Sequence, residues 1–250
     1  MGQRRSPLGV EDLERLAARG WRALEEDALG GWLLRAGGGF TGRANSALVV
    51  GDPGLPLPQA VDAVVGWYAE RGLRPCAQLA GVQSRAADTA FAAAGWERDE
   101  DTLVLTAPIG APQPVAVPVE IAPAPDDGWL AGYRYRGAAL PPAATEVLTN
   151  AEQLAFASVR PDPAPAPPAA VARGVLTDGW LGVTAVTVDE QHRRRGLATA
   201  VMGALQNWAA ERGAHSVYLQ VAAGNAPARA LYRRAGFIEH HRYHYRRPGA

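Results

Sequence analysis

The run Arg193-Arg194-Arg195-Gly196-Leu197-Ala198 combines residue types that are suited to binding phosphate groups. It follows an apolar strand pattern, Leu181 to Val188, and opens a segment in which apolar residues recur at helical spacing. A helix N-terminus presents unpaired backbone N–H groups and the positive end of the helix dipole. Gly196 allows a close approach of the backbone, and the arginines add charge. The run therefore predicts a cradle for a pyrophosphate, with a solvated helix start as the alternative interpretation.

Further candidate functional residues follow the next expected strand. Asn225 precedes an expected helix from Ala226 to Ala235, where its side chain is suited to capping the helix. Tyr232 lies on the same helix. Taken alone, a core aromatic side chain is the simpler interpretation of Tyr232. A Gly236-Phe237 pair ends the segment.

These two segments resemble the GNAT superfamily, the acyl-CoA-dependent N-acetyltransferases. The family's Q/R-x-x-G-x-G/A signature matches Arg193 to Ala198. The remainder of its cofactor half matches the preceding strand, Asn225, Tyr232 and the Gly236-Phe237 pair. The resemblance covers about residues 119–245. The whole chain is also similar to two-domain actinobacterial GNAT proteins, some labelled N-acetylglutamate synthase, which carry a segment like Gly42 to Ser46.

The resemblance implies direct transfer of an acetyl group from acetyl-CoA to a primary amine in a ternary complex, without a metal ion. The backbone of Val186 and Val188 would bind the pantetheine arm, and one of their N–H groups would polarise the thioester carbonyl. Asn225 would hydrogen-bond the pantetheine arm or order water beside it. Tyr232 would donate a proton to the departing thiolate. The residues that would hold the pyrophosphate are Arg193, Arg194, Arg195, Gly196, Leu197, Ala198 and Thr199.

The chain departs from many GNAT relatives in its general base, because no carboxylate lies between Leu181 and Val188. Thr184 and Thr187 in this segment are most simply strand formers. A backbone carbonyl with ordered water, or an amine that arrives neutral, could replace the base. The carboxylates that could substitute are Glu120, Glu146, Glu152, Asp126 and Asp127. If the acceptor is an amino acid such as glutamate, the cations that could match its carboxylates are Arg134, Arg136 and Arg160.

Strand and helix patterns alternate along the chain, which predicts an α/β fold with a mixed sheet. The order helix, strand, helix, Gly-aromatic pair, strand occurs twice at an offset of 141 residues, and the two copies end with the expected strands 102–106 and 238–245. Chance similarity in a chain rich in Ala, Arg and Gly is the alternative to a duplication. The aligned residues are Trp67 with Trp208, 69–72 with 210–213, Phe91 with Tyr232, and 94–96 with 235–237.

The N-terminal copy lacks the residues of the expected cradle. Asp52 to Leu57 stands in place of the arginine run, and its two prolines remove N–H donors. Ser84 corresponds to Asn225, and Phe91 to Tyr232. We therefore expect tandem GNAT-like domains: a degenerate domain without a CoA site at residues 1–110, a linker at 111–118 and a catalytic N-acetyltransferase domain at 119–250.

The composition argues against several other classes of protein. The 250 residues include 25 Arg, no Lys and 25 acidic side chains, and 48% of them are hydrophobic, which suits a buried core. A zero net charge disfavours a nucleic-acid-binding protein, whereas 10 Arg against 4 acids from Asp189 onward favour an anionic ligand. We expect a cytoplasmic monomer or homodimer that binds neither nucleic acid nor membranes. An acyl-CoA-binding regulatory module without activity is the alternative to an enzyme. The tail from His240 to Arg247 is typical of a solvated basic strand.

Overall fold

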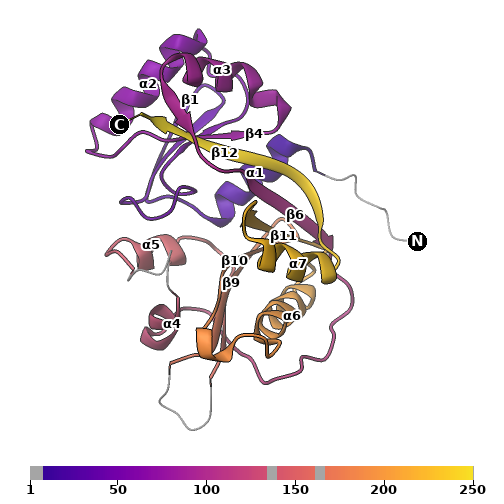
Figure 1. Ribbon diagram of the computed structural model, residues 1–250. Coiled ribbons are helices and arrows are strands. Elements are labelled where there is room, and N and C mark those ends of the chain that lie inside the picture. Colours follow the sequence, from indigo (N-terminus) through magenta and orange to yellow (C-terminus); the bar gives the residue numbers. More distant parts are fainter. Residues whose placement is uncertain (1–7, 134–139, 161–166, 250) are drawn as a thin grey trace. The chain divides into compact units, whose positions relative to one another are not determined.

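The computed structural model describes residues 8–133, 140–160 and 167–249. The chain forms two compact units (Figure 1). The first unit consists of Met1–Asp101 together with His240–Ala250, and the second of Thr102–Glu239. Within the described residues, no helix is long and apolar enough to cross a membrane.

The first unit contains a sheet in the order β1-β2-β3-β4-β12, in which β3 and β4 are parallel and the other neighbours are antiparallel. α2 and α3 pack on one face through a core that includes Trp32, Tyr68 and Phe91. The elements are α1 (Val10–Gly20), β1 (Glu25–Leu29), β2 (Trp32–Ala36), β3 (Ala47–Val49), α2 (Leu57–Ala69), β4 (Ala77–Ala80), a 3-10 turn (Val82–Ser84), α3 (Arg85–Ala93), β5 (Trp96–Arg98), which pairs with β12, and β12 (Ile238–Pro248).

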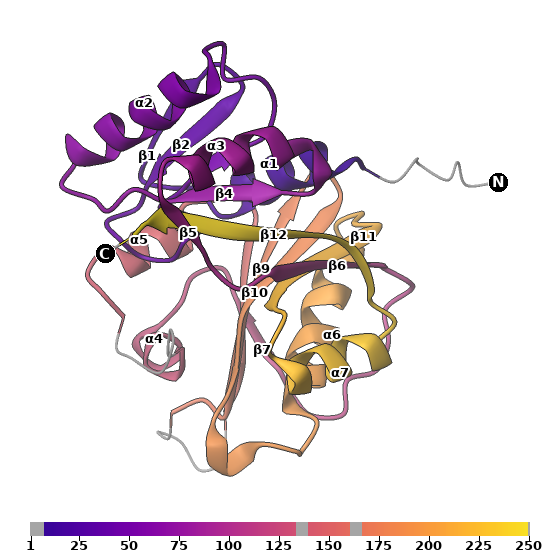
Figure 2. The same ribbon diagram turned by 45° about the horizontal axis from the view of Figure 1, so that its top comes forward.

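The second unit contains a sheet in the order β6-β11-β10-β9-β8-β7, in which only β10 and β11 are parallel among the described pairs. α6 and α7 lie on one side of β9 and β10, and α4 and α5 on the other (Figure 2). The elements are β6 (Thr102–Pro108), β7 (Glu120–Ala122), α4 (Asp127–Gly132), α5 (Ala144–Thr149), β8 (Leu154–Val159), β9 (Ala170–Thr177), β10 (Trp180–Val188), a 3-10 turn (Glu190–His192), α6 (Leu197–Ala210), β11 (Ser216–Ala222) and α7 (Ala226–Arg234).

The two units repeat one topology. The order β1-β2-β3-β4 with a closing antiparallel strand in the first unit corresponds to β8-β9-β10-β11 with a closing antiparallel strand in the second. α3 and α7 coincide residue for residue at the offset of 141, because Arg85 corresponds to Ala226 and Ala93 to Arg234. This agreement of pairing, direction and register supports the interpretation of the sequence repeat as a duplication.

Each unit takes its closing strand from the other half of the sequence. β12, which was expected in the second copy, pairs with β4 of the first unit. β6, which was expected in the first copy, pairs with β11 along its whole length, from Thr102 opposite Ala222 to Pro108 opposite Ser216. The unit boundaries therefore fall near residues 101 and 239 and differ from the expected limits at 110 and 119. An apolar strand pattern does not specify which of two similar sheets the strand joins.

Three short elements had no detectable pattern in the sequence. α4 and α5 have six residues each, which is too short for helical periodicity. β1 is an edge strand with an almost fully exposed, polar sequence, so that it lacks the alternation of a half-buried strand.

The segment after β6 is held on α6, because the backbone of Gln113 exchanges two hydrogen bonds of 2.9 and 2.7 Å with the Asn207 side chain.

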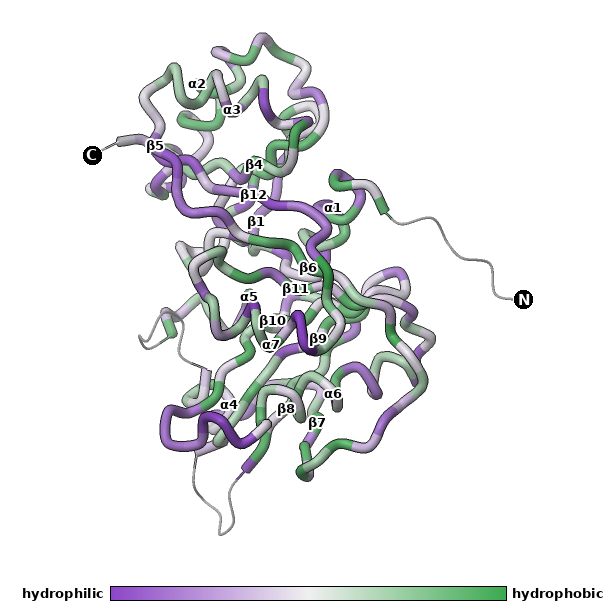
Figure 3. The backbone as a smooth tube through the Cα atoms, turned by 45° about the vertical axis from the view of Figure 1, so that its right-hand side comes forward, coloured by the Kyte–Doolittle hydropathy of each residue, from purple (hydrophilic) through white to green (hydrophobic). Residues whose placement is uncertain are grey.

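A chain of buried polar side chains lies on the α1 side of the first unit's sheet. Arg35 Nη2 donates to Gln78 Oε1 at 2.8 Å, Gln78 Nε2 donates to Glu14 Oε2 at 2.7 Å, and His241 Nε2 lies 2.7 Å from Glu14 Oε1. β12 is strongly hydrophilic along its sequence (Figure 3), yet His241 is only 8% exposed and Tyr243 is buried. The expectation of a solvated basic strand is therefore wrong for this part of β12, because Glu14 offers His241 a buried hydrogen-bond partner.

Candidate active site

A fork opens between two neighbouring strands of the second unit. β10 and β11 pair in parallel only as far as Val183 and Leu219, although both strands continue beyond this pair in the described sheet. β10 stays paired with β9, but its register shifts between Thr184 and Thr187. Ala185, inside this bulge, adopts a φ of 55°. Because a bulge bends and twists its strand, it turns the end of β10 away from β11.

Val186 and Val188, whose backbone is predicted to bind the ligand, lie on the diverging segment of β10. Both side chains are half-buried and pack against the core of the unit. Their anchoring fixes the direction of the backbone along the fork. An extended ligand can form main-chain hydrogen bonds in such a gap in the way that an added strand does.

The N-terminus of α6 directly follows this strand end. Gly196 is the N-cap residue, with a φ of 78° and a ψ of 3°, and no side chain of the described residues caps the helix. Leu197 is buried and anchors the first turn, Ala198 is half-buried and Thr199 is exposed. A Cβ atom added at Gly196 would meet no described atom within 4 Å. The first N–H groups of α6 therefore have no side-chain acceptor, and the space beside Gly196 is open.

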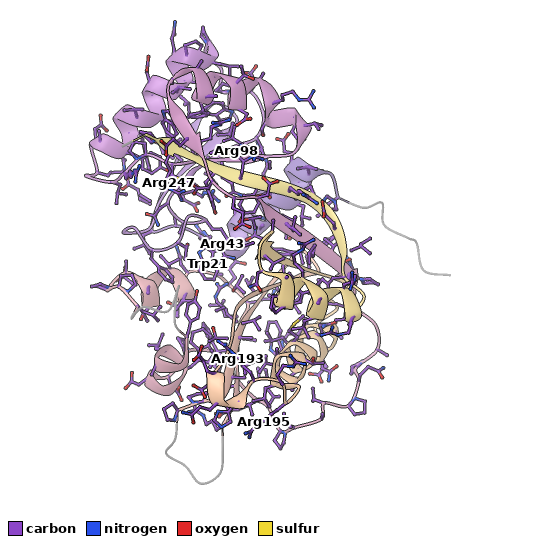
Figure 4. The ribbon with its side chains drawn as sticks, viewed as in Figure 1. Trp21, Arg43, Arg98, Arg193, Arg195 and Arg247 are labelled. Atoms are coloured by element: carbon purple, nitrogen blue, oxygen red, sulfur yellow. The ribbon has the colours of Figure 1, made fainter. Side chains whose placement is uncertain are left out.

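The arginine run surrounds this helix start with positive charge. Figure 4 shows Arg193 and Arg195 where β10 leads into α6. Arg193 pairs with Glu190 at 3.2 Å, and both side chains are exposed. Arg194 and Arg195 are exposed and, among the described residues, have no ion-pair partner. The run thus supplies cations that are not neutralised by the protein's described carboxylates.

Asn225 is the N-cap residue of α7, and Tyr232 lies on this helix. Asn225 Oδ1 accepts a hydrogen bond from Ala228 N at 3.1 Å, which confirms that Asn225 caps this helix. Tyr232 is 7% exposed, its ring lies 5.9 Å from that of Phe237, and it belongs to the same core as Leu197 of α6. Burial raises the pKa of Tyr232 to about 12. Its hydroxyl makes no hydrogen bond within the described part of the chain. The protonated phenol can therefore donate to a ligand.

Two of the candidate bases are held by Arg160. Asp126 accepts a hydrogen bond from Trp129 N and pairs with Arg160 at 2.6 Å, and both contacts lower the pKa of the Asp126 carboxyl. Glu120 lies 3.2 Å from the same guanidinium. These pairs make Asp126 a weak base and engage Arg160 with protein carboxylates rather than leaving it free for a substrate.

The other candidate bases and cations are less constrained. Glu146 on α5, Asp127 on α4 and Glu152 before β8 are exposed. Arg134 and Arg136 lie outside the described residues. Within the described residues, no three His, Cys, Asp or Glu side chains gather as a metal site would require.

One residue of this site was missed in the sequence. Thr184 stands at the fork, and its Oγ1 atom is buried with no hydrogen-bond partner among the described atoms. A threonine in a strand pattern has no distinguishing signal, because its type favours strands wherever it lies.

Comparison with known proteins assigns the chain to a family. The family model "Probable histone acetyltransferase Rv0428c C-terminal" matches residues 9–246. The chain belongs to this family. The relative named Probable histone acetyltransferase Rv0428c, from Mycobacterium tuberculosis, is 33% identical over 248 residues, which cover 94% of this chain and 73% of the relative.

Solved structures show the same fold as this chain. A GCN5-related N-acetyltransferase from Kribbella flavida has a TM-score of 0.70 at 20% identity and covers 96% of both chains. A tandem GNAT protein from the clavulanic acid biosynthesis pathway has a TM-score of 0.61 at 15% identity and covers 98% of this chain and 89% of that chain. The expected family and the mixed α/β fold are confirmed. The protein is a GNAT acyltransferase, and its fold implies the use of an acyl-CoA.

Proposed function

We propose that the second unit transfers an acetyl group from acetyl-CoA to a primary amine by direct attack. The observation that carries this proposal is the fork between β10 and β11 next to the uncapped start of α6. The fork suits an extended arm with amide groups, and the helix start suits a pyrophosphate. The two features lie on consecutive elements of one unit, as a ligand that has both groups requires.

The residues present fit acetyl-CoA. The backbone of Val186 and Val188 would bind the pantetheine arm along the fork. The pyrophosphate would accept hydrogen bonds from the N–H groups of the first turn of α6, and the neighbouring arginines, including Arg194 and Arg195, would balance its charge. Asn225 already uses its Oδ1 atom as a cap, which leaves its amide N–H groups for the arm or for a water molecule.

The reaction then forms one C–N bond and breaks one C–S bond. A backbone N–H group of the diverging β10 would stabilise the negative charge on the thioester oxygen during attack. Tyr232 would give its proton to the thiolate that departs, and the amine would lose a proton to water or to a base of the site. The Tyr232 phenolate would then regain a proton from solvent, so that no net charge stays on the protein. The burial that raises the pKa of Tyr232 also raises the basicity of a thiolate formed beside it, so that proton transfer between them stays feasible.

The first unit would not bind CoA. In its equivalent of the fork, Ser84 Oγ lies 2.7 Å from Val49 O of β3 and 3.0 Å from Ala80 O of β4, so that one hydroxyl bridges the ends of both strands. α2 begins after Pro56 and has a further proline in its first turn, which removes N–H donors. Phe91 lacks the hydroxyl of Tyr232. These features support a degenerate GNAT-like unit that keeps the fold without the cofactor site.

The experiment that tests the proposed function is the release of CoA from acetyl-CoA with a panel of amines. The panel contains glutamate, other amino acids, small primary amines and, because of the name of the mycobacterial relative, a lysine-rich peptide. A sample without acceptor gives the blank. Acceptor-dependent release would establish the transferase. Saturable acetyl-CoA binding without release would favour the regulatory module, and absence of binding would overturn the cofactor site.

A first prediction concerns Gly196. We expect the change Gly196→Ala to weaken acetyl-CoA binding by about tenfold or more, because the added methyl group enters the open space beside the helix start and the residue must keep a positive φ. Isothermal titration with acetyl-CoA measures this effect. The matched control is Gly213→Ala, since Gly213 follows α6, has a φ of 82° and is equally uncrowded. Equal affinities of the two variants would contradict the cradle.

A further inference from the structure

Thr184 belongs to a row of side chains that crosses three strands of the second unit. Its direct partner on β9 is Arg173, and the partner of Arg173 on β8 is Phe156. Residues directly opposite in antiparallel strands project from the same face of a sheet. Phe156 packs edge-on against Trp129 of α4 with ring centroids 5.0 Å apart, and Arg173 Nε donates to Leu148 O of α5 at 2.7 Å. The row, and Thr184 with it, therefore faces α4 and α5.

The opposite face of the same strands carries α6. A Cβ atom added at Gly174, the neighbour of Arg173, would meet the side chain of Leu205 at 2.9 Å. Val183, the neighbour of Thr184, belongs to the core that Leu205 shares. Thr184 thus stands at the fork but projects to the side that the helix cradle does not occupy.

The hydroxyl of Thr184 is unusual for its lack of partners. Its Oγ1 atom is buried and makes no hydrogen bond to any described atom. The hydroxyl of Thr187, which follows on the same strand, lies 3.4 Å from Ala185 O. Buried polar groups are nearly always paired, and an unpaired one in a native structure points to a role in strain, chemistry or ligand binding. Its location at the first residue beyond the last β10–β11 pair places it beside the proposed reacting centre.

We propose that Thr184 Oγ1 binds the acceptor amine. This inference rests on the proposed function, because the fork would hold the thioester while the amine approaches from the side of α4 and α5. The hydroxyl oxygen accepts a hydrogen bond from one N–H of the neutral primary amine. That bond leaves the nitrogen lone pair free and holds it toward the thioester carbon. Thr184 does not take up the proton of the reaction, so it is a substrate-binding residue that orients the nucleophile.

The test uses three substitutions in the full chain. Thr184→Val keeps the shape of the side chain and removes the hydroxyl, Thr184→Ser keeps the hydroxyl, and Thr187→Val removes the neighbouring hydroxyl as a matched control. The probes are the amines that the wild-type protein acetylates. We expect Thr184→Val to raise KM for the amine by about tenfold, with KM for acetyl-CoA nearly unchanged. Thr184→Ser should recover most of the loss, and Thr187→Val should leave KM for the amine unchanged.

A thermal unfolding scan separates binding from a structural role. Thr184→Val should unfold at the same temperature as the wild type or higher, because it removes a buried hydroxyl that has no partner. An unchanged KM for the amine in Thr184→Val, or an equal loss in Thr184→Ser, would overturn the inference while leaving the proposed transferase intact. A wild-type protein that binds acetyl-CoA but acetylates no amine would overturn both.

Discussion

Replacing Tyr232 by Phe is expected to lower the turnover number by about a hundredfold or more, while KM for acetyl-CoA changes little. The change removes only the hydroxyl, and the ring keeps its packing against Phe237, 5.9 Å away. The affected step is the protonation of the departing thiolate, which contributes to the transition state and not to ground-state binding. Steady-state kinetics with the best amine of the panel measure both constants.

The pH dependence offers a second measurement of the same role. Burial raises the pKa of Tyr232 to about 12, so the phenol keeps its proton across the range in which the protein can be assayed. We therefore expect no decline in wild-type turnover from ionisation of Tyr232 as the pH rises to about 10. A decline that is present in the wild type and absent in Tyr232→Phe would contradict this expectation.

Tyr68→Phe is the matched control for Tyr232→Phe. Tyr68 is buried in the first unit, and its hydroxyl donates to Arg35 O at 2.9 Å. Its loss should lower the free energy of unfolding by about 1 kcal/mol without changing the turnover of folded protein. If Tyr232→Phe behaves like Tyr68→Phe, with reduced stability and unchanged turnover, Tyr232 is a core residue and another group protonates the thiolate.

The largest effect on stability is expected at Glu14. Its carboxylate accepts hydrogen bonds from His241 and Gln78, and Gln78 in turn accepts one from Arg35. Glu14 is 2% exposed, so that Glu14→Gln removes the negative charge from a buried chain of polar groups. Removing the oxygen that pairs with His241 leaves a buried hydrogen-bonding group unsatisfied, and we expect a loss of about 2 to 3 kcal/mol in the free energy of unfolding at neutral pH. Urea denaturation measures it.

The same helix provides the comparison. Glu11 on α1 pairs with Arg15 at 2.8 Å, but both side chains are more than 40% exposed. Glu11→Gln should therefore cost less than about 1 kcal/mol, since water screens this pair. Equal losses for Glu11→Gln and Glu14→Gln would mean that the buried chain contributes no more than a surface pair.

The sequence was informative where a backbone conformation depends on residue type. The run from Arg193 to Ala198 predicted a helix start, which the structure shows directly after Gly196, and Asn225 predicted a cap because its side chain suits one. The α/β alternation followed from apolar periodicity. The roles of these residues toward acetyl-CoA stay predictions until the variants are measured.

Other features depend on contacts that a linear pattern does not contain. The bulge at Ala185, which opens the fork, breaks no compositional rule. Whether His241 is buried depends on a partner on α1, more than 200 residues earlier in the chain. The absence of a partner for the Thr184 hydroxyl is likewise a property of the packed sheet, where neighbouring atoms and not the residue type decide the outcome.

The placement of β12 has a consequence for how the protein is made. The second unit is one uninterrupted stretch, Thr102–Glu239, so the ribosome supplies all its strands before it supplies the end of β12. Until His240–Ala250 has emerged, the first unit lacks its closing strand, and β4 presents an unpaired sheet edge to other nascent chains. Synthesis of β12 is thus the step that covers this edge, and a chain that ended before Tyr243 would leave β4 unpaired on this side.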